Sequence, residues 1–263
     1  MGLRVDHSIF SDITSYVETV KQERYASGSA LVIIKDDEII HEWYSGTHHF
    51  EKGAKKVDDA SRFNVYSVRV TYIGLAIALA VEEGLLSLDD RISDYLIEYD
   101  VDTLAHTTIR HLLTRCTGLN FKEKKVNRLF DPGTNIEGKK PDLLAKILYK
   151  ATGKTVNEVL TDKVIKPLNL INTGWVTAAN ENLVSDINLS ASYPALRMGS
   201  NIGDERNLYI SAKDLAIWGN LHLNKGKYKG KQILSTNVFN LTTSIQSPHS
   251  LPKHLPKFSF FGG

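Results

Sequence analysis

The residues best placed to do chemistry lie at the start of a long apolar segment. Ser67 precedes the run Ile73 to Val81, which has no polar face and is followed by Gly84. A helix that is apolar on all sides is buried, and glycine commonly follows the end of a helix. The segment therefore predicts a buried helix with Ser67 at its N-terminal end, where backbone N–H groups could stabilise an oxyanion.

A serine hydroxyl becomes an effective nucleophile only when a neighbouring group removes its proton. A lysine three residues later would share a helix face with the serine and could do this. The sequence has Val70 at that position, and valine accepts no proton. Two interpretations of Ser67 remain open at this point: a nucleophile that has lost its base, or a serine that merely caps the helix.

From Phe63 onward the sequence resembles the serine β-lactamase and penicillin-binding protein superfamily. The resemblance is strongest to the branch that contains class C β-lactamases, D-alanyl peptidases and esterases. It extends through an ordered series of segments, at 62–96, 108–120, 130–135, 143–175 and 207–234. It implies an α/β fold of the α+β type, in which a helical lobe packs against an antiparallel sheet lobe, as in the β-lactamase/transpeptidase-like fold.

The resemblance also implies three catalytic elements, and the sequence departs from each. The first pairs a serine with a lysine, and here Ser67 is retained while Val70 replaces the lysine. The second is a Tyr-x-Asn triplet after the Pro-Gly-Thr turn, where this sequence has Gly138 and Lys140. The third is a Lys-Thr-Gly or His-x-Gly strand, and the sequence ends at FSFFGG before any such strand. These departures predict a protein that is catalytically inactive or severely impaired, a pseudoenzyme.

A substitute base would preserve some activity. Lys139 or Lys140 could take the place of the missing lysine, because the pKa of a lysine falls readily when the side chain is desolvated. The alternative is that both are solvated lysines in a loop before Pro141. Arg69 is excluded as a base because a guanidinium is effectively never deprotonated in proteins.

Composition predicts an ordinary globular domain. The 263 residues include 32 Lys and Arg and 30 Asp and Glu, so no strong field favours nucleic acid. We expect a small acyl compound or a protein as the partner, with no cofactor, no metal and no membrane span. His48 and His49 near Glu51 are interpreted as part of a surface loop rather than a ligand set. The N-terminus lacks the apolar run of a signal peptide, so the sequence as written predicts a cytoplasmic protein, or an extracytoplasmic one if a leader was removed.

The chain is expected to be organised in three parts. Residues 1–60 would form an amphipathic helix at Ser8 to Gln22 and a hairpin at 29–46 that turns at Asp36 and Asp37. Residues 61–234 would form the mainly helical lobe. Residues 235–263 would return toward the sheet, with KFSFF at 257–261 as its remaining strand. The sheet would then be incomplete, and its open edge predicts self-association or coverage by a partner.

Two functions from different classes follow. The chain could be a serine acyl hydrolase that acts weakly on β-lactams, D-alanyl peptides or esters through Ser67. It could instead be a binding protein that has kept the fold and lost the chemistry.

Overall fold

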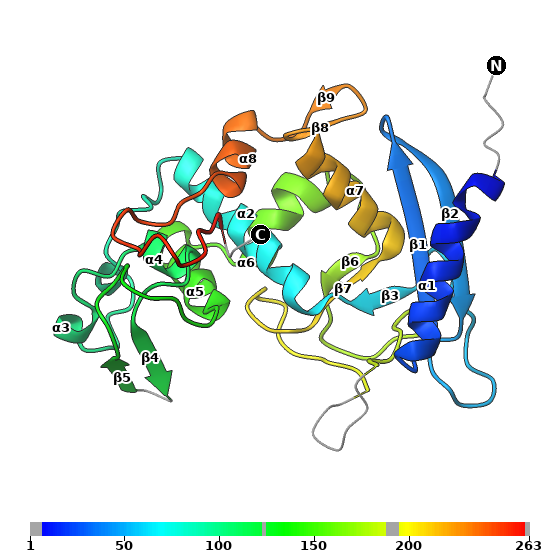
Figure 1. Cartoon of the computed structure of the whole chain (residues 1–263), viewed down its shortest axis with the longest axis horizontal. Helices are drawn as coiled ribbons and strands as arrows, with labels where there is room; N and C mark the ends of the chain where they lie inside the picture. The colour runs from blue at the N-terminus through cyan, green and yellow to red at the C-terminus, as the bar shows by residue number, and fades with distance from the viewer. Residues whose placement is uncertain (1–6, 123–124, 188–194, 261–263) are drawn as a thin grey trace. The chain divides into compact units, whose positions relative to one another are not determined.

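The computed structural model describes residues 7–122, 125–187 and 195–260 (Figure 1). The chain forms two compact units. The first comprises Met1–Tyr66, Val164–Asn201 and Glu205–Ile233, and the second comprises Ser67–Lys163, Ile202–Asp204 and Leu234–Gly263. The chain thus enters each unit more than once.

A β-hairpin is the largest sheet element of the first unit. Strands β1 (Gly28–Lys35) and β2 (Glu38–Gly46) pair in antiparallel fashion. Asp36 and Asp37 form the turn with φ angles of 51° and 63°, the positive values that a two-residue hairpin turn requires. The predicted hairpin and its turn are confirmed. No third strand among the described residues pairs with it, so both of its edges are unpaired there.

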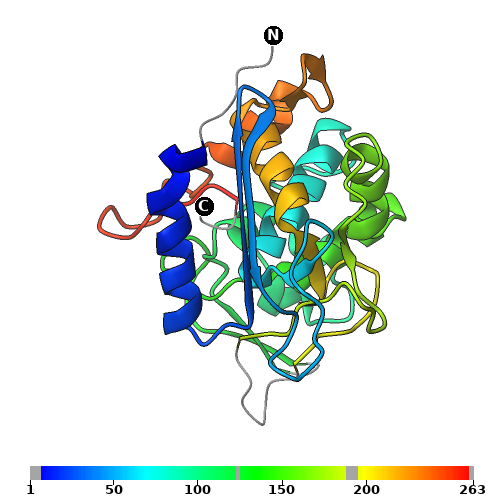
Figure 2. The same ribbon diagram turned by 90° about the vertical axis from the view of Figure 1, so that its right-hand side faces the viewer.

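Two helices cover the faces of this hairpin (Figure 2). Helix α1 (Ser11–Glu23), which follows the 3₁₀ turn η1 (His7–Phe10), and helix α7 (Ala212–Leu223) both pack on β1. The amphipathic helix predicted at Ser8 to Gln22 forms, but its apolar side chains are only partly covered. No residue of α1 is buried, and Ile13 and Tyr16 are 41% and 63% exposed. Strands lie only about 4.8 Å apart, so a two-stranded hairpin is too narrow to cover the stripe.

A second, three-stranded sheet also belongs to the first unit. Its order is β3–β7–β6, with β3 at Arg62–Asn64, β7 at Leu208–Ser211 and β6 at Thr173–Trp175, all antiparallel. The whole of β7 is buried. Ser211 ends this strand and caps α7, because its Oγ accepts a hydrogen bond of 3.2 Å from the Asp214 N–H. The short hairpin β8 (Lys227–Tyr228) and β9 (Lys231–Gln232) follows α7.

Helix α2 (Arg69–Glu82) is the centre of the second unit. Helices α5 (Pro141–Thr152), α6 (Val156–Leu160) and α8 (Thr236–Thr243) pack against it. Residues 72–80 are buried, and Gly84 has a φ of 71° just beyond the helix end. The buried helix and its stop are confirmed. In the described ranges, no helix is long and apolar enough to cross a membrane.

Shorter elements complete the second unit. They are η3 (Ile92–Asp94), α3 (Val101–Leu104), α4 (Ile109–Leu113) and the hairpin β4 (Leu119–Lys122) with β5 (Lys125–Arg128). The five-residue π-helical turn Thr161–Ile165 lies where the chain passes from the second unit to the first.

Residues 244–260, the described part of the segment after α8, form no strand. Phe258 instead exchanges hydrogen bonds with the loop before it: its N–H donates to Ser247 Oγ at 2.7 Å, and its carbonyl accepts from Gln246 N at 2.8 Å. The Arg115 guanidinium lies 4.9 Å from the Phe258 ring centre, and Phe260 is only 7% exposed. The expected strand at 257–261 is therefore wrong for residues 257–260, because these aromatic side chains pack within the second unit. Phe261 lies outside the described residues.

Candidate active site

Ser67 lies in a 3₁₀ turn (Tyr66–Val68) that leads directly into α2. The turn begins with the N–H of Tyr66 donating to Asn64 Oδ1 at 2.9 Å, and Tyr66 has a positive φ of 45°, which is rare for an aromatic residue. The Ser67 side chain is exposed. Among the described residues of its own unit, the Ser67 hydroxyl makes no hydrogen bond. The N-cap of α2 is Val68, without a side-chain cap, so the capping interpretation of Ser67 is wrong.

The position where a base would lie belongs to the apolar core. Val70 is 5% exposed, in the first turn of α2, three residues after Ser67. Its neighbour Arg69 is also buried, and Nη1 of Arg69 donates to the carbonyl of Asp204 at 3.0 Å. Arg69 thus holds the short segment 202–204 onto the helix. Neither side chain can remove a proton from Ser67.

The loop before α5 holds the other positions singled out in the sequence. Lys140 is the N-cap residue of α5, and its Nζ lies 2.5 Å from Glu137 Oε1. The same carboxylate oxygen accepts a hydrogen bond of 3.1 Å from the Thr117 N–H, and a further one from the Thr117 hydroxyl. Because the amino group of Lys140 is paired with this carboxylate, it is not directed toward Ser67 as a base would have to be. Gly138 is exposed, and a Cβ added there would meet no atom within 4 Å.

Lys139 differs from Lys140. Burial, together with the nearby charge of Arg115, lowers the pKa of Lys139 below its usual value. This is the direction that a general base requires. Gly138, Lys139 and Lys140 lie together along a cavity of about 420 Å³, which Leu119, Asn120 and Phe121 also line. Ser67 is not among the residues that line this cavity. The structure thus groups the three loop residues along one cavity, and among the described residues of the second unit no hydrogen bond or ion pair joins them to Ser67.

Sequence reasoning missed two residues that shape this region. Glu137 fixes Lys140, and the E-x-x-K spacing before Pro141 was the available signal. Tyr66, with its positive φ angle, begins the 3₁₀ turn that contains Ser67. The guanidinium of Arg197 lies 5.1 Å from the Tyr66 ring centre, a favourable cation–π distance. No sequence pattern links these two residues, which are far apart in the chain.

One interpretation of the histidines is corrected. His48 does not lie on a surface loop, because it is 3% exposed and its Nε2 is 2.8 Å from Ser61 Oγ. Its burial lowers the pKa of the imidazole below the usual value. The strand-to-strand connection after β2 is thus held by a buried polar contact.

The family model for beta-lactamase matches residues 13–257 of this sequence. The chain belongs to the beta-lactamase family. It is 37% identical over 253 residues to an uncharacterised protein of Alkalihalophilus pseudofirmus, covering 95% of this chain and 75% of that protein. It is 23% identical over 277 residues to protein flp of Staphylococcus aureus, covering 94% of this chain and 55% of flp.

Solved structures agree with the fold of this beta-lactamase-family chain. The octameric penicillin-binding protein homologue of Pyrococcus abyssi superposes with a TM-score of 0.72 at 19% identity, covering 89% of this chain. The chain spans about 60% of the length of that protein. At this identity the comparison shows the fold. The α/β class with mixed helices and antiparallel sheet, as in β-lactamases and transpeptidases, is therefore confirmed.

Proposed function

We propose that this member of the beta-lactamase family is catalytically inactive or severely impaired, and that it serves as a binding protein. One observation carries the proposal: the position three residues after Ser67 is the buried Val70. General-base assistance typically accelerates such reactions by about 10²–10⁴-fold. A serine without that assistance would acylate too slowly for useful turnover.

The loop before α5 supports the same proposal. Gly138 offers no side chain for proton transfer, and the ammonium of Lys140 is held by Glu137. The ligand of such a protein would be a small acyl compound of the kind its family resemblance implies, or a protein. The balance of 32 basic and 30 acidic residues gives no reason to expect nucleic acid.

A second candidate function rests on Lys139. Because partial burial and the nearby charge of Arg115 lower the pKa of this lysine, a larger fraction of it is neutral at neutral pH than for a fully solvated lysine. A neutral amine that reached the Ser67 hydroxyl would restore slow acyl transfer to β-lactams, D-alanyl peptides or esters. This function requires a movement of the loop at 138–140, since Ser67 does not line its cavity.

Intact-protein mass spectrometry separates the two functions. The chain is incubated with a reactive penicillin and, separately, with a fluorophosphonate, beside Ser67→Ala and Lys139→Gln. The proposal expects no adduct, or an equally slow adduct in the original chain and in Lys139→Gln. A rapid adduct that is absent from Ser67→Ala and strongly slowed in Lys139→Gln would favour the acyl hydrolase.

A further inference from the structure

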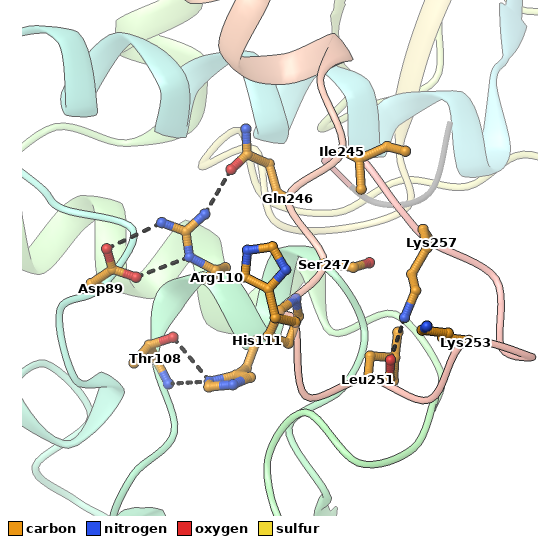
Figure 3. Close-up of a pocket in the computed structure, with 12 residues that line it drawn as sticks. Asp89, Thr108, Arg110, His111, Ile245, Gln246, Ser247, Leu251, Lys253 and Lys257 are labelled. Atoms are coloured by element: carbon orange, nitrogen blue, oxygen red, sulfur yellow. Dashed lines mark hydrogen bonds and ion pairs between the residues drawn. The ribbon is translucent and has the colours of Figure 1, made fainter.

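The second unit contains a cavity of about 800 Å³ that the proposed role of Ser67 does not use (Figure 3). One wall is the start of α4, with Thr108, Arg110 and His111. The other wall is the loop 245–257, which follows α8. Ser67 and the loop at 138–140 do not line this cavity. Any ligand bound here would therefore be separate from the candidate acyl-transfer site.

Arg110 and Asp89 neutralise each other at one side of the cavity. Arg110 Nε donates to Asp89 Oδ1 at 2.9 Å and Nη2 donates to Oδ2 at 3.1 Å, which is a bidentate pair. The remaining nitrogen, Nη1, donates to Gln246 Oε1 at 2.7 Å. Asp89 is the only carboxylate among the residues that line the cavity. Its charge is thus already matched by the guanidinium.

Two lysines add positive charge that no carboxylate matches. Within the described ranges, Lys253 and Lys257 form no ion pair. Lys257 Nζ donates to the carbonyls of Leu251 and Pro252, and these partners carry no net charge. Both lysines line the cavity and belong to the loop that follows α8, as Figure 3 labels them. Two unmatched ammonium groups in one concave site attract an anion.

His111 contributes a neutral donor with a fixed proton. Its Nδ1 accepts a hydrogen bond of 3.0 Å from the Thr108 N–H, so the proton of the neutral imidazole is on Nε2. Burial and the charge of Arg110 lower the pKa of His111 to about 4, so the ring is neutral at neutral pH. Gly133 lies beside the Nε2 edge of the ring, where a larger residue would crowd it. Its φ is 78°, and a Cβ there would lie 2.5 Å from Ser250 Oγ and 3.4 Å from His111 Nε2.

The cavity also offers apolar contact. Ile245 is 68% exposed at its rim, and Pro248 and Leu251 line the loop wall. A ligand that fills the cavity would thus meet both cationic and apolar groups. We propose that this cavity binds a small molecule in which a phosphate or carboxylate group is attached to an apolar body. Lys253 and Lys257 supply the attraction for the anion, and His111 supplies a neutral N–H donor.

The test uses phenyl phosphate and benzoate as probes, with benzyl alcohol as the uncharged analogue. Binding to the full chain is followed by ¹H–¹⁵N NMR at constant ionic strength, including the His111 side chain. The variant is Lys253→Glu, because Lys253 is exposed and its replacement should leave the fold intact. The matched control is Lys231→Glu, an exposed lysine of β9 in the first unit.

We expect saturable binding of at least one anionic probe, with shifts at His111 and little binding of benzyl alcohol. Lys253→Glu should weaken this binding about tenfold, since an attraction becomes a repulsion, and Lys231→Glu should leave it unchanged. The preferred probe identifies the anionic group. Absence of saturable binding by both anions would overturn the proposal. Equal weakening by the two variants would also overturn it, because the attraction would then belong to the whole surface.

Discussion

Replacing His111 by glutamine should remove a loss of stability that the chain suffers in acid. His111 is the third residue of α4, and its Nδ1 accepts from the N–H of the helix cap Thr108. Glutamine at this position can accept the same hydrogen bond, so the start of α4 is preserved. Glutamine does not titrate. The variant therefore isolates the effect of protonating the imidazole.

The magnitude follows from the shift of the pKa. Burial lowers the pKa of His111 from 6.5 to about 4 in the folded chain. Between these values the unfolded chain binds a proton that the folded chain does not bind, so stability falls as the pH falls through this window. When the pH falls from about 7 to about 4.5, linkage gives a ceiling of about 2 kcal/mol for this loss of stability. The side chain is only partly buried, so we expect roughly 1–2 kcal/mol after allowance for solvent screening.

The assay is urea unfolding followed by circular dichroism at both pH values. His254→Gln, which replaces an exposed histidine of the same unit, serves as the control. Between the two pH values, the free energy of unfolding should fall further in the original chain and in His254→Gln than in His111→Gln. The expected difference is roughly 1–2 kcal/mol. An NMR titration should also show His111 remaining neutral well below pH 6.5. Identical acid sensitivity of all three proteins would refute the reasoning about His111.

Three further outcomes are expected. Val70→Lys alone should give at most slow acylation by a reactive penicillin in an intact-mass assay, because Gly138 and Lys140 are unchanged; rapid turnover would contradict this. Glu137→Gln should weaken the contact with Lys140, because a charged hydrogen bond is lost. The free energy of unfolding in urea should fall by about 1–3 kcal/mol. An unchanged urea midpoint would show that solvent replaces the contact. The two unpaired edges of the β1–β2 hairpin should promote self-association in sedimentation velocity experiments, and a monomer at high concentration would argue against it.

Elements with strong local patterns could be predicted from the sequence. The apolar run at Ile73 to Val81 identified α2, because such a run is stable only when buried. Asp36 and Asp37 identified the hairpin turn, because aspartate tolerates the positive φ that the turn requires. In each case a few adjacent residues are enough to determine the local structure.

Strands that depend on distant partners could not be predicted in this way. Strand β3 (Arg62–Asn64) and strand β7 (Leu208–Ser211) are short and pair across most of the chain, so neither shows a usable periodicity. The segment at 257–261 was expected to be a strand because it remained to complete the sheet that the family resemblance implies. Tertiary contacts, including that between Arg115 and Phe258, override this expectation.

The candidate site could be predicted only in part. Ser67 and Val70 are readable because their spacing along one helix is fixed by helix geometry. The ion pair between Glu137 and Lys140 needs the path of a loop, and its support from Thr117 comes from another segment. The positive φ angle of Tyr66 could not be predicted from the sequence either. The spacing of Ser67 and Val70 therefore predicted that the usual lysine base is missing. The contacts that hold Lys140 could be seen only in the structure.

Turnover that depends on Ser67 tests the central proposal most directly. The chain and its Ser67→Ala variant are compared on a chromogenic cephalosporin and on an activated ester, at equal protein concentration and neutral pH. We expect the same rate from both proteins, at the level of the background hydrolysis, because the buried Val70 cannot remove the serine proton. A rate well above background that disappears in Ser67→Ala would contradict the proposal and show that another group serves as the base.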